Sequence, residues 1–354
     1  MAVAGEPVAG QTSRTRCVWG VGLLCGAYVV LALVPLAVGV VRPGITGYPR
    51  AMLEDAVYGR AHQPFVKRQL VPLMVRGSAA MVPERVSESL SRAFADSKLV
   101  QRLGWPPSYA TEFVLSLVLM YAGMLAFLVV LRAFLHACLD LPTRLGHTAT
   151  LVVGVALPVT FAGQLYLYDF WQLFLFTAGL LWMVRGRWWL YYPTFVLACL
   201  NKETSLLLPV VMAVWMGRQV VGRRQLVHLL AQLVGGGAIV FALAWAFGDN
   251  PGAGLEWHFG RNLSMPFTML AWLRLTVLAA ALVLSLASIR RAPAFLARGL
   301  VATLPVLVIA ALFFGYIDEL RDYYEALPFV VALVLLTVAG KVAGRPGTAQ
   351  APVA

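Results

Sequence analysis

The chain has 354 residues and a formal net charge of +12. Hydrophobic residues make up 60% of it and charged residues 12%, about half the charged share of an ordinary soluble domain. A soluble fold cannot bury that much apolar surface, so the composition excludes a soluble enzyme, a disordered chain and a secreted disulfide scaffold, and it indicates a multi-pass membrane protein. The basic residues are divided among short segments between apolar runs, which excludes nucleic acid as a partner.

The N-terminus predicts a retained membrane anchor. A polar tail, 1–16, precedes an apolar run over 17–41. The apolar region of a signal peptide is only about 7–15 residues long, so we expect 17–41 to be the first membrane helix. The four cysteines lie in or beside apolar runs and lack metal-type spacing, so we interpret them as small buried residues; they are Cys17, Cys25, Cys138 and Cys199.

The segment 42–108 is too long to be a simple turn. Apolar residues recur with helical spacing over 86–103, which predicts an amphipathic helix on the membrane surface. A more apolar piece, 69–82, is expected at the interface. Before it stand two adjacent acids, Glu54 and Asp55. A carboxylate at the membrane surface suits a general base, with Asp55 the preferred candidate, and the alternative is a pair of solvated loop charges.

Further spans follow from the requirement of about 20 apolar residues per crossing. With 17–41, we expect spans at 110–135, 148–166, 169–184, 226–247, 268–289, 299–317 and 326–340. The interval 188–217 is apolar except for its centre, and it has basic residues at both ends. One continuous helix would place those basic residues on opposite sides of the membrane, so the positive-inside tendency favours a hairpin of two short helices.

The resulting topology has ten membrane helices in one transmembrane domain, 17–341, with both termini cytoplasmic and 42–108 outside. Most basic residues outside 42–108 then lie on the cytoplasmic side, whereas the short outer loops hold only Arg261 and Arg321. The acids show the opposite distribution, so acid and base chemistry is expected on the outer face. The tail 342–354 is rich in Gly, Pro and Ala and is expected to be disordered.

Two charged residues flank the predicted spans as candidate ligand-binding groups. Arg68 lies in the sequence Arg-Gln-Leu-Val-Pro just before an interfacial segment, where its planar donor group could hold a phosphate. Simple anchoring to lipid headgroups is the alternative. Asp169 begins the span 169–184, so it is either a substrate-binding acid or a helix cap that favours the helix dipole.

The tip of the predicted hairpin carries the most specific signal. Each arm has about 13 residues and so reaches only about 20 Å, which leaves Lys202 and Glu203 below the membrane surface. Charged side chains at that depth usually face a polar cavity or substrate. We therefore expect Lys202 to contact an anionic ligand; a mutually neutralising pair is the alternative. Glu319 and Arg321 lie in the last outer loop, where at least one is expected to face the bundle; a solvated charged loop is the alternative.

The chain has no P-loop, no G-x-G-x-x-G after a strand, no H-E-x-x-H and no G-x-S-x-G, so nucleotide hydrolysis, hydride transfer and zinc proteolysis lack support.

Four short features together resemble the GT-C superfamily of membrane glycosyltransferases that use polyprenyl-phosphate sugars. They are the long first outer loop with its acid, Asp55, and surface helix; Arg-x-Leu-x-Pro from Arg68; Asn-Lys-Glu-Thr around Lys202; and Glu-Leu-Arg before the last helix. The resemblance covers about 20–340. It departs from many such enzymes in having two adjacent acids, which leaves the base open between them, and in lacking a large soluble C-terminal domain, which leaves the acceptor unidentified.

The resemblance implies a GT-C-like fold in a bacterial inner membrane and an inverting sugar transfer on its outer face. Lys202, Arg68 or Arg321 would bind the phosphate of a lipid-linked sugar, while Asp55 would take a proton from the acceptor hydroxyl of a cell-envelope molecule. No cofactor is implied, and the sequence identifies neither a metal nor a protein partner. The alternatives are a transporter or lipid flippase, in which buried charges mark a translocation route, and a non-catalytic component of an envelope complex.

Overall fold

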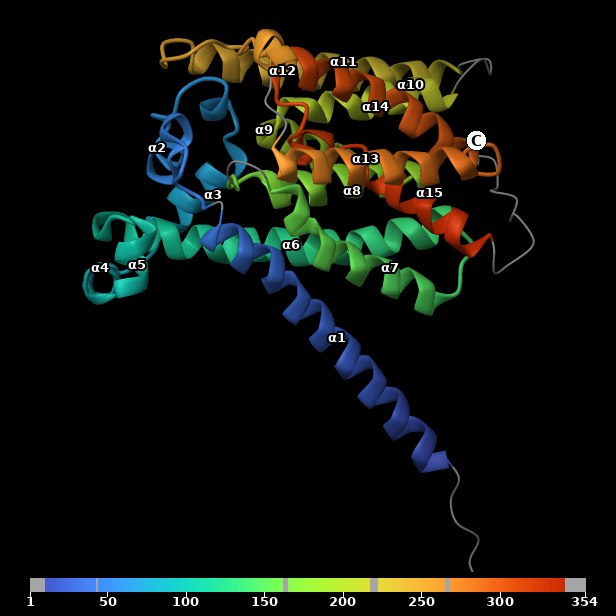
Figure 1. The fold of residues 1–354 in the computed structure, drawn as a ribbon, viewed down its shortest axis with the longest axis horizontal. Coiled ribbons are helices and arrows are strands. Elements are labelled where there is room, and N and C mark those ends of the chain that lie inside the picture. The colour runs from blue at the N-terminus through green and yellow to red at the C-terminus, as the bar shows by residue number, and fades with distance from the viewer. Residues whose placement is uncertain (1–9, 43, 162–164, 217–221, 265–267, 341–354) are drawn as a thin grey trace, which may run out of the picture.

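The computed structural model describes residues 10–42, 44–161, 165–216, 222–264 and 268–340, and these form helices and connecting loops without β-strands (Figure 1). The α-helices in chain order are α1 (Gly10–Val41), α2 (Leu53–Val57), α3 (Leu70–Ala79), α4 (Glu84–Asp96), α5 (Lys98–Leu103), α6 (Ala110–Cys138), α7 (Thr143–Ala156), α8 (Asp169–Val184), α9 (Trp188–Asn201), α10 (Leu207–Met216), α11 (Arg223–Ala246), α12 (Phe259–Ser264), α13 (Met269–Ser288), α14 (Ala294–Phe314) and α15 (Leu327–Ala339). The predicted tail 342–354 lies outside the described residues.

Among the described residues, five helices are long and apolar enough to cross a membrane, which supports an all-helical membrane protein. They are Gly22–Val41, Pro107–Cys138, Arg223–Ala246, Ala271–Ser288 and Ala294–Phe314. The described residues also include four shorter apolar helices, which are Leu70–Ala79, Asp169–Val184, Glu203–Met216 and Leu327–Ala339.

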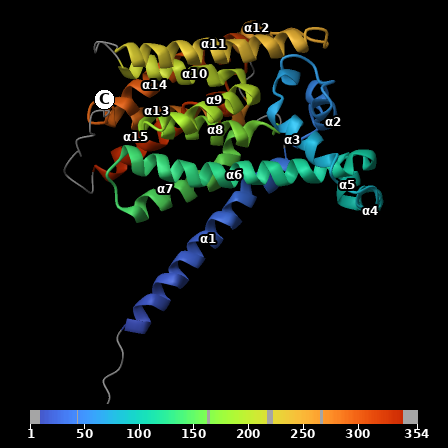
Figure 2. The same ribbon diagram turned by 180° about the vertical axis from the view of Figure 1, so that it is seen from behind.

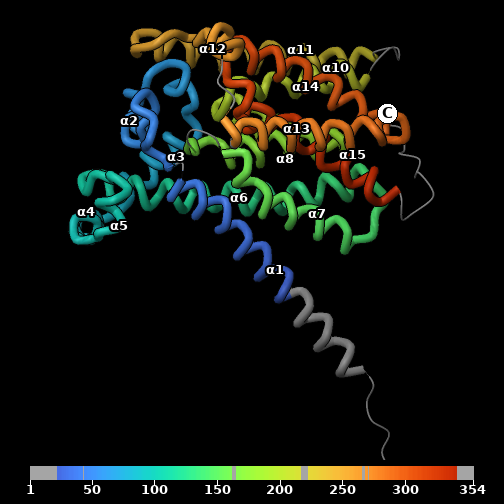
Figure 3. Tube along the Cα trace, in the orientation of Figure 1, coloured from blue at the N-terminus to red at the C-terminus, as the bar shows by residue number. Residues whose placement is uncertain are grey.

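The long helices α6, α11 and α13 run in roughly the same direction, with α11 at the top of the view and α6 below it (Figure 1). The small helices α2 to α5 gather at one end of this bundle, and the view from behind shows the same grouping (Figure 2). The Cα trace follows α1 away from the bundle at an angle (Figure 3). We call the end that carries α2 to α5 the loop end.

Other connecting segments meet at the loop end through backbone hydrogen bonds. The amide of Leu165 donates to the carbonyl of Gly44 at 3.0 Å. The amide of Gln69 donates to Leu200 at 2.9 Å, at the end of α9. His258 donates to the carbonyl of Phe313 at 2.8 Å, at the end of α14. Segments far apart in the sequence are therefore held together at the loop end.

The chain reverses direction at Lys202. Helix α9 ends at the loop end, where Asn201 donates through Nδ2 to the carbonyl of Tyr168 at 3.1 Å. At the other end of the bundle, Trp188 stacks on His228 in the first turns of α11, with ring centroids 4.2 Å apart. The carbonyl of Trp215, near the end of α10, accepts a hydrogen bond from Arg298 in the first turns of α14. Both ends of the segment 188–216 thus lie at the end of the bundle opposite Lys202, so the two helices form a hairpin.

Local hydrogen bonds explain this reversal. Lys202 has an extended backbone, with φ −160° and ψ 136°, so it cannot continue the helix. The carbonyl of Ala198 accepts hydrogen bonds from the amide of Lys202 and from the hydroxyl of Ser205, each at 2.9 Å, and these contacts hold the chain at the end of α9. A short 3-10 turn, η5 (Glu203–Leu206), then leads into α10.

Helix α6 packs along α8 through a close contact between a glycine and an aromatic ring. A Cβ added to Gly123 would lie 2.8 Å from the Trp171 ring, so only glycine allows the ring to approach. The indole Nε1 of Trp171 donates to the carbonyl of Leu119 at 2.9 Å. This contact fixes the start of α8, and with it Asp169, relative to α6.

Some predicted helix boundaries differ from the observed ones. The segment 86–103 forms α4 and α5 instead of one helix, because Ser97 ends the first and accepts a hydrogen bond from the amide of Val100 in the second. The segment 148–166 contains the end of α7 and a 3-10 turn, η4 (Leu157–Thr160), with Pro158 in its first turn. Helix α3 buries Val71 and Val75 completely, so it packs into the bundle as well as lying near its surface.

Candidate functional site

Three cationic side chains, of which Lys202 and Arg321 are buried and Arg68 is largely buried, come together at the loop end from three separate segments. Arg68 follows the 3-10 turn η2 (Phe65–Lys67), Lys202 lies at the reversal between α9 and η5, and Arg321 lies in the 3-10 turn η6 (Leu320–Tyr323). Their side chains are 11%, 8% and 7% exposed. Buried charges require nearby partners, and each of the three has a carboxylate within 4 Å. We call these cations and their partners the charge network.

Arg68 forms the ion pair with the most favourable geometry. Its Nη2 and Nε lie 2.9 Å and 3.4 Å from the two carboxylate oxygens of Glu203, which is a two-pronged contact. Its Nη1 also donates to the hydroxyl of Tyr168. Burial opposes the charged guanidinium, but Glu203, Tyr168 and Tyr166 together outweigh that effect and raise the pKa of Arg68 above its ordinary value. Arg68 therefore stays protonated.

Lys202 pairs with a residue that sequence analysis did not identify. Its Nζ lies 3.6 Å from Oε1 of Glu325, whose side chain is fully buried. The same oxygen accepts hydrogen bonds from Nε2 of Gln172, at 2.9 Å, and from the hydroxyl of Thr204. The other oxygen, Oε2, has no hydrogen-bond partner among the described residues. Glu325 thus brings Lys202, α8 and η5 to one point, with one acceptor unused.

Arg321 joins two acids from different segments. Its Nη2 lies 2.7 Å from Oε1 of Glu319, and its Nη1 lies 3.7 Å from Oδ2 of Asp169. Asp169 also accepts a hydrogen bond from the amide of Tyr166 at 3.0 Å. Burial disfavours the charge of Arg321, but Glu319 and Asp169 raise its pKa well above the ordinary value. Asp169 is therefore an ion-pair partner in addition to beginning α8.

Two stacked tyrosines separate Arg68 from Arg321. The rings of Tyr166 and Tyr168 lie 5.2 Å apart and are nearly parallel, at 10°. The guanidinium of Arg321 lies 4.2 Å from the Tyr166 centroid, and that of Arg68 lies 4.4 Å from the Tyr168 centroid. Such cation–π contacts are strongest where water is excluded. Both tyrosines are buried, so their rings lie within the charge network.

A pocket opens beside Arg68. Tyr166 and Tyr168 line it together with Ile45, Ala51, Leu53, Ala56, Phe65, Pro72 and Leu167, so its wall is mainly apolar. Its free space is small, about 10 Å³, which is room for a water-sized group. Arg68 belongs both to this pocket and to the charge network, so it connects them.

The two adjacent acids of the first loop lie in α2 but do not line this pocket. Leu53 and Ala56, three residues apart, turn one face of α2 toward it, and the intervening residues point elsewhere. The carboxylate of Asp55 is 36% exposed and lies 3.1 Å from Nε of Arg60. Glu54 is buried, and its Oε2 has no hydrogen-bond partner among the described residues.

Six of the eight sequence-predicted site residues therefore belong to the charge network, and Glu54 and Asp55 lie apart from it. The six are Arg68, Asp169, Lys202, Glu203, Glu319 and Arg321. The network also contains Glu325 and Gln172, which the sequence analysis did not select. The sequence feature that could have identified Glu325 is its position directly before the apolar span 326–340. Gln172 could have been identified as a polar residue within the apolar span 169–184.

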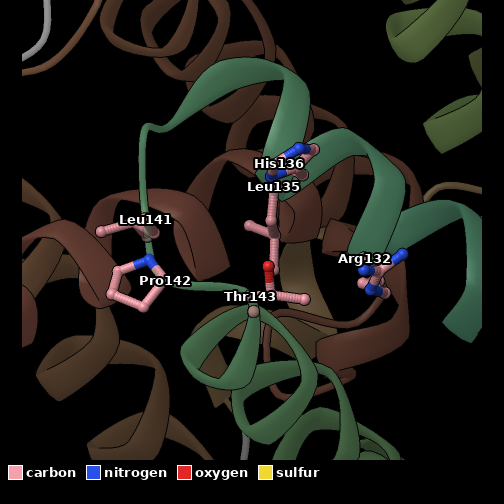
Figure 4. Close-up of a pocket in the computed structure, with 7 residues that line it drawn as sticks. Arg132, Leu135, His136, Leu141, Pro142 and Thr143 are labelled. Atoms are coloured by element: carbon pink, nitrogen blue, oxygen red, sulfur yellow. The ribbon is translucent and has the colours of Figure 1, made fainter. Parts of the chain in front are cut away.

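A second pocket lies at the other end of the bundle, where α6 joins α7. Figure 4 shows Arg132 and His136 from α6 together with Leu141, Pro142 and Thr143. Arg132 and His136 are one helical turn apart, so they share a face of α6. This pocket includes no carboxylate and does not involve the charge network.

No group of three or more His, Cys, Asp or Glu side chains in the described part of the chain is arranged to hold a metal ion. Comparison with known proteins adds no further constraint, since no family model, curated protein or solved structure matches this chain.

Proposed function

We propose that this protein is a GT-C-type membrane glycosyltransferase that takes a sugar from a polyprenyl-phosphate donor. The observation that carries the proposal is the double position of Arg68, which pairs with Glu203 and also lines the apolar pocket. A lipid-linked sugar phosphate has the same combination of groups: an anionic phosphate, hydroxyls and an apolar chain. The stacked Tyr166 and Tyr168 also line that pocket.

The proposed reaction assigns a role to each charged group. The acceptor oxygen attacks C1 of the sugar, the bond from C1 to the phosphate oxygen breaks, and the polyprenyl phosphate leaves. Arg68, Lys202 and Arg321 would stabilise the negative charge that develops on that phosphate. Asp55 is the proposed base that takes the acceptor proton, and Glu54 is the alternative. Inversion at C1 is an expectation from the resemblance to the family.

Donor binding requires carboxylates to give way, because each cation already has an acidic partner. Glu203 is the partner best placed to move, since its side chain is 42% exposed whereas that of Glu325 is fully buried. We propose that the phosphate competes with Glu203 for Arg68. Lys202 directly precedes Glu203 in the chain. It would contribute its positive charge to phosphate binding while its ion pair with Glu325 stays in place.

The proposed topology has ten membrane helices, both termini in the cytoplasm and the loop end outside a bacterial inner membrane. It rests on the charge distribution of the sequence and on the reversal at Lys202, which places both basic flanks of 188–217 on one side. Single-cysteine labelling at position 96, in a chain without other cysteines, tests the orientation. Labelling of intact cells by an impermeant reagent supports it, and labelling only after permeabilisation contradicts it.

The function is tested by transfer from a radiolabelled polyprenyl-phosphate sugar to a cell-envelope extract by the purified protein. Release of polyprenyl phosphate that requires both protein and extract supports the proposal. The matched pair Glu325→Gln and Lys202→Met/Glu325→Gln tests the lysine, because both variants lack the acid and only the first keeps the cation. We expect donor binding to survive in the first and to weaken in the second. Equal donor binding in both would remove Lys202 from the site.

A second candidate, a proton-coupled transporter, is favoured by one observation. Glu325 is buried beside Lys202 and has one oxygen without a partner in the described part of the chain, and buried acids of this kind serve as proton carriers in transporters. Liposomes that hold the protein and a pH-sensitive dye distinguish the two functions. Proton movement that depends on an added lipid-linked sugar, with no cleavage of the sugar, would favour transport.

A further inference from the structure

A fourth buried cation, Arg274, lies in the candidate membrane helix Ala271–Ser288. Only 22% of the most apolar window of that helix is buried inside the protein, so most of α13 faces outward. Arg274 belongs to the buried minority, with 7% exposure, and it shares the inward face with Ala271 and Ser285. It therefore does not extend outward along the apolar surface, as many arginines near the ends of membrane helices do.

The partners of Arg274 differ from those of the other three buried cations. Its Nη2 donates to the backbone carbonyl of Phe161 at 2.9 Å. Its Nε has no hydrogen-bond partner among the described residues, and no ion pair joins Arg274 to a carboxylate there. The residues that the structure does not describe include one acid, Glu6, in the N-terminal tail. A carbonyl alone does not neutralise a buried guanidinium, which is costly without an opposite charge.

The position of Arg274 indicates where an anion would come from. It is the sixth residue of α13, so it lies about 8 Å from the start of that helix at the loop end. Its neighbours Trp272 and Leu273 are 56% and 54% exposed on the apolar outer surface. A membrane lipid whose chains lie against that surface would have its headgroup at the level of Arg274. The planar donors of arginine match phosphate oxygens well.

We propose that Arg274 binds the phosphate group of a membrane lipid at a site formed by α13 and the backbone at Phe161. This site is separate from the pocket beside Arg68, whose wall includes neither Phe161 nor Arg274. Binding of the lipid at Arg274 does not depend on sugar transfer.

The test measures lipid binding by the purified full chain in neutral detergent. The probes are a polyprenyl phosphate, phosphatidylglycerol, diacylglycerol without phosphate, and inorganic phosphate. Each is scored by native mass spectrometry and by the rise in unfolding temperature that it causes. Loss of a charge-assisted contact is expected to weaken binding of the two phosphate lipids about tenfold or more in Arg274→Gln. Arg290→Gln, an exposed arginine beyond the far end of α13, is the matched control and is expected to bind as the parent does.

Each outcome decides the proposal. Unchanged binding of both phosphate lipids by Arg274→Gln overturns it, even if the variant is less stable, because a purely structural arginine lowers the unfolding temperature without changing the lipid-induced rise. Weakening for only one phosphate lipid supports the site and identifies its ligand. Equal loss of diacylglycerol binding overturns the phosphate contact. An inorganic phosphate effect as large as that of the lipids overturns the assignment to a lipid.

A second measurement covers the case in which Arg274→Gln does not fold. A photoreactive p-benzoylphenylalanine in place of the exposed Leu273 keeps Arg274 intact. We expect it to crosslink to phosphatidylglycerol, with competition by the polyprenyl phosphate and not by diacylglycerol. Equal competition by diacylglycerol would contradict a phosphate-dependent site. This experiment scores no transfer, so it remains informative if the protein is not a glycosyltransferase.

Discussion

Nζ of Lys202 lies 3.6 Å from Oε1 of Glu325, and this ion pair links the reversal between α9 and η5 to the segment that precedes α15. Both side chains are buried, at 8% and 0% exposure. Removal of one partner of a buried ion pair costs about 3–5 kcal/mol, whereas joint replacement by neutral groups costs much less. The pair therefore couples two distant parts of the chain.

The first prediction concerns the stability of this pair. Lys202→Met leaves Glu325 buried without its cation, so we expect a lower unfolding temperature in detergent for that variant. Lys202→Met/Glu325→Gln should recover most of the loss. Thermal unfolding followed by circular dichroism checks both. If the double variant loses as much stability as Lys202→Met and Glu325→Gln together, the two residues act independently and the contact is unimportant.

The second prediction concerns Arg68. Its replacement in Arg68→Gln removes a cation that lines the pocket and frees Glu203. We expect binding of a polyprenyl phosphate to fall about tenfold or more, the usual worth of one or two charge-assisted hydrogen bonds. Arg85→Gln, an exposed change in α4, is the control for net charge. A similar loss in both variants would attribute the effect to net charge instead of to the pocket.

The third prediction compares the two adjacent acids. A base must reach the acceptor hydroxyl, and Asp55 is 36% exposed whereas Glu54 is buried. We expect Asp55→Asn to lower sugar transfer by about 10²–10⁴-fold, the usual worth of general-base catalysis. Glu54→Gln should leave transfer within a few-fold of the parent. The reverse order of rates would assign the base to Glu54.

The sequence was sufficient to predict the helical membrane character and to select six of the residues that the structure brings together in the charge network. Composition predicted the membrane character. Lys202 and Glu203 were identified because charged residues within an apolar interval are costly in a membrane. The same reasoning, applied less strictly, would have selected Arg274, since it too lies inside an apolar run. The sequence thus shows which residues are unusual for a membrane helix, because they are charged residues within apolar runs.

The pairing of those residues was not predictable from the sequence. Which acid neutralises Lys202 depends on how α8, η5 and the segment before α15 meet, and this is set by tertiary contacts such as that of Gln172 with Glu325. Tyr166 and Tyr168 have the composition of an interfacial belt, yet packing buries them between two arginines. The helix break at Ser97 depends on one side-chain cap and does not disturb the amphipathic pattern.

The fourth prediction concerns pH. Burial, followed by repulsion from Glu319, raises the pKa of Asp322 to about 6. The folded state therefore favours the protonated form, and this contribution is complete below the ordinary pKa of 3.8 and is lost as pH rises through about 6. Asp322→Asn cannot ionise, so its unfolding temperature relative to the parent should rise between pH 4 and pH 7. A constant difference across that range would show that Asp322 titrates normally.

The last prediction uses two adjacent glycines of α11 as a matched pair. A Cβ on Gly236 would lie 2.7 Å from Leu206 and 2.8 Å from the ring of Phe195, whereas a Cβ on Gly235 would meet nothing within 4 Å. Overpacking of this kind costs about 1–3 kcal/mol, while alanine at an open helical position is favourable relative to glycine. We expect Gly236→Ala to lower the unfolding temperature and Gly235→Ala to maintain or raise it. Since Leu206 and Phe195 flank the reversal at Lys202, Gly236→Ala should also weaken donor binding. Equal stability of the two variants would mean that α11 does not pack against α9 and η5 at this point.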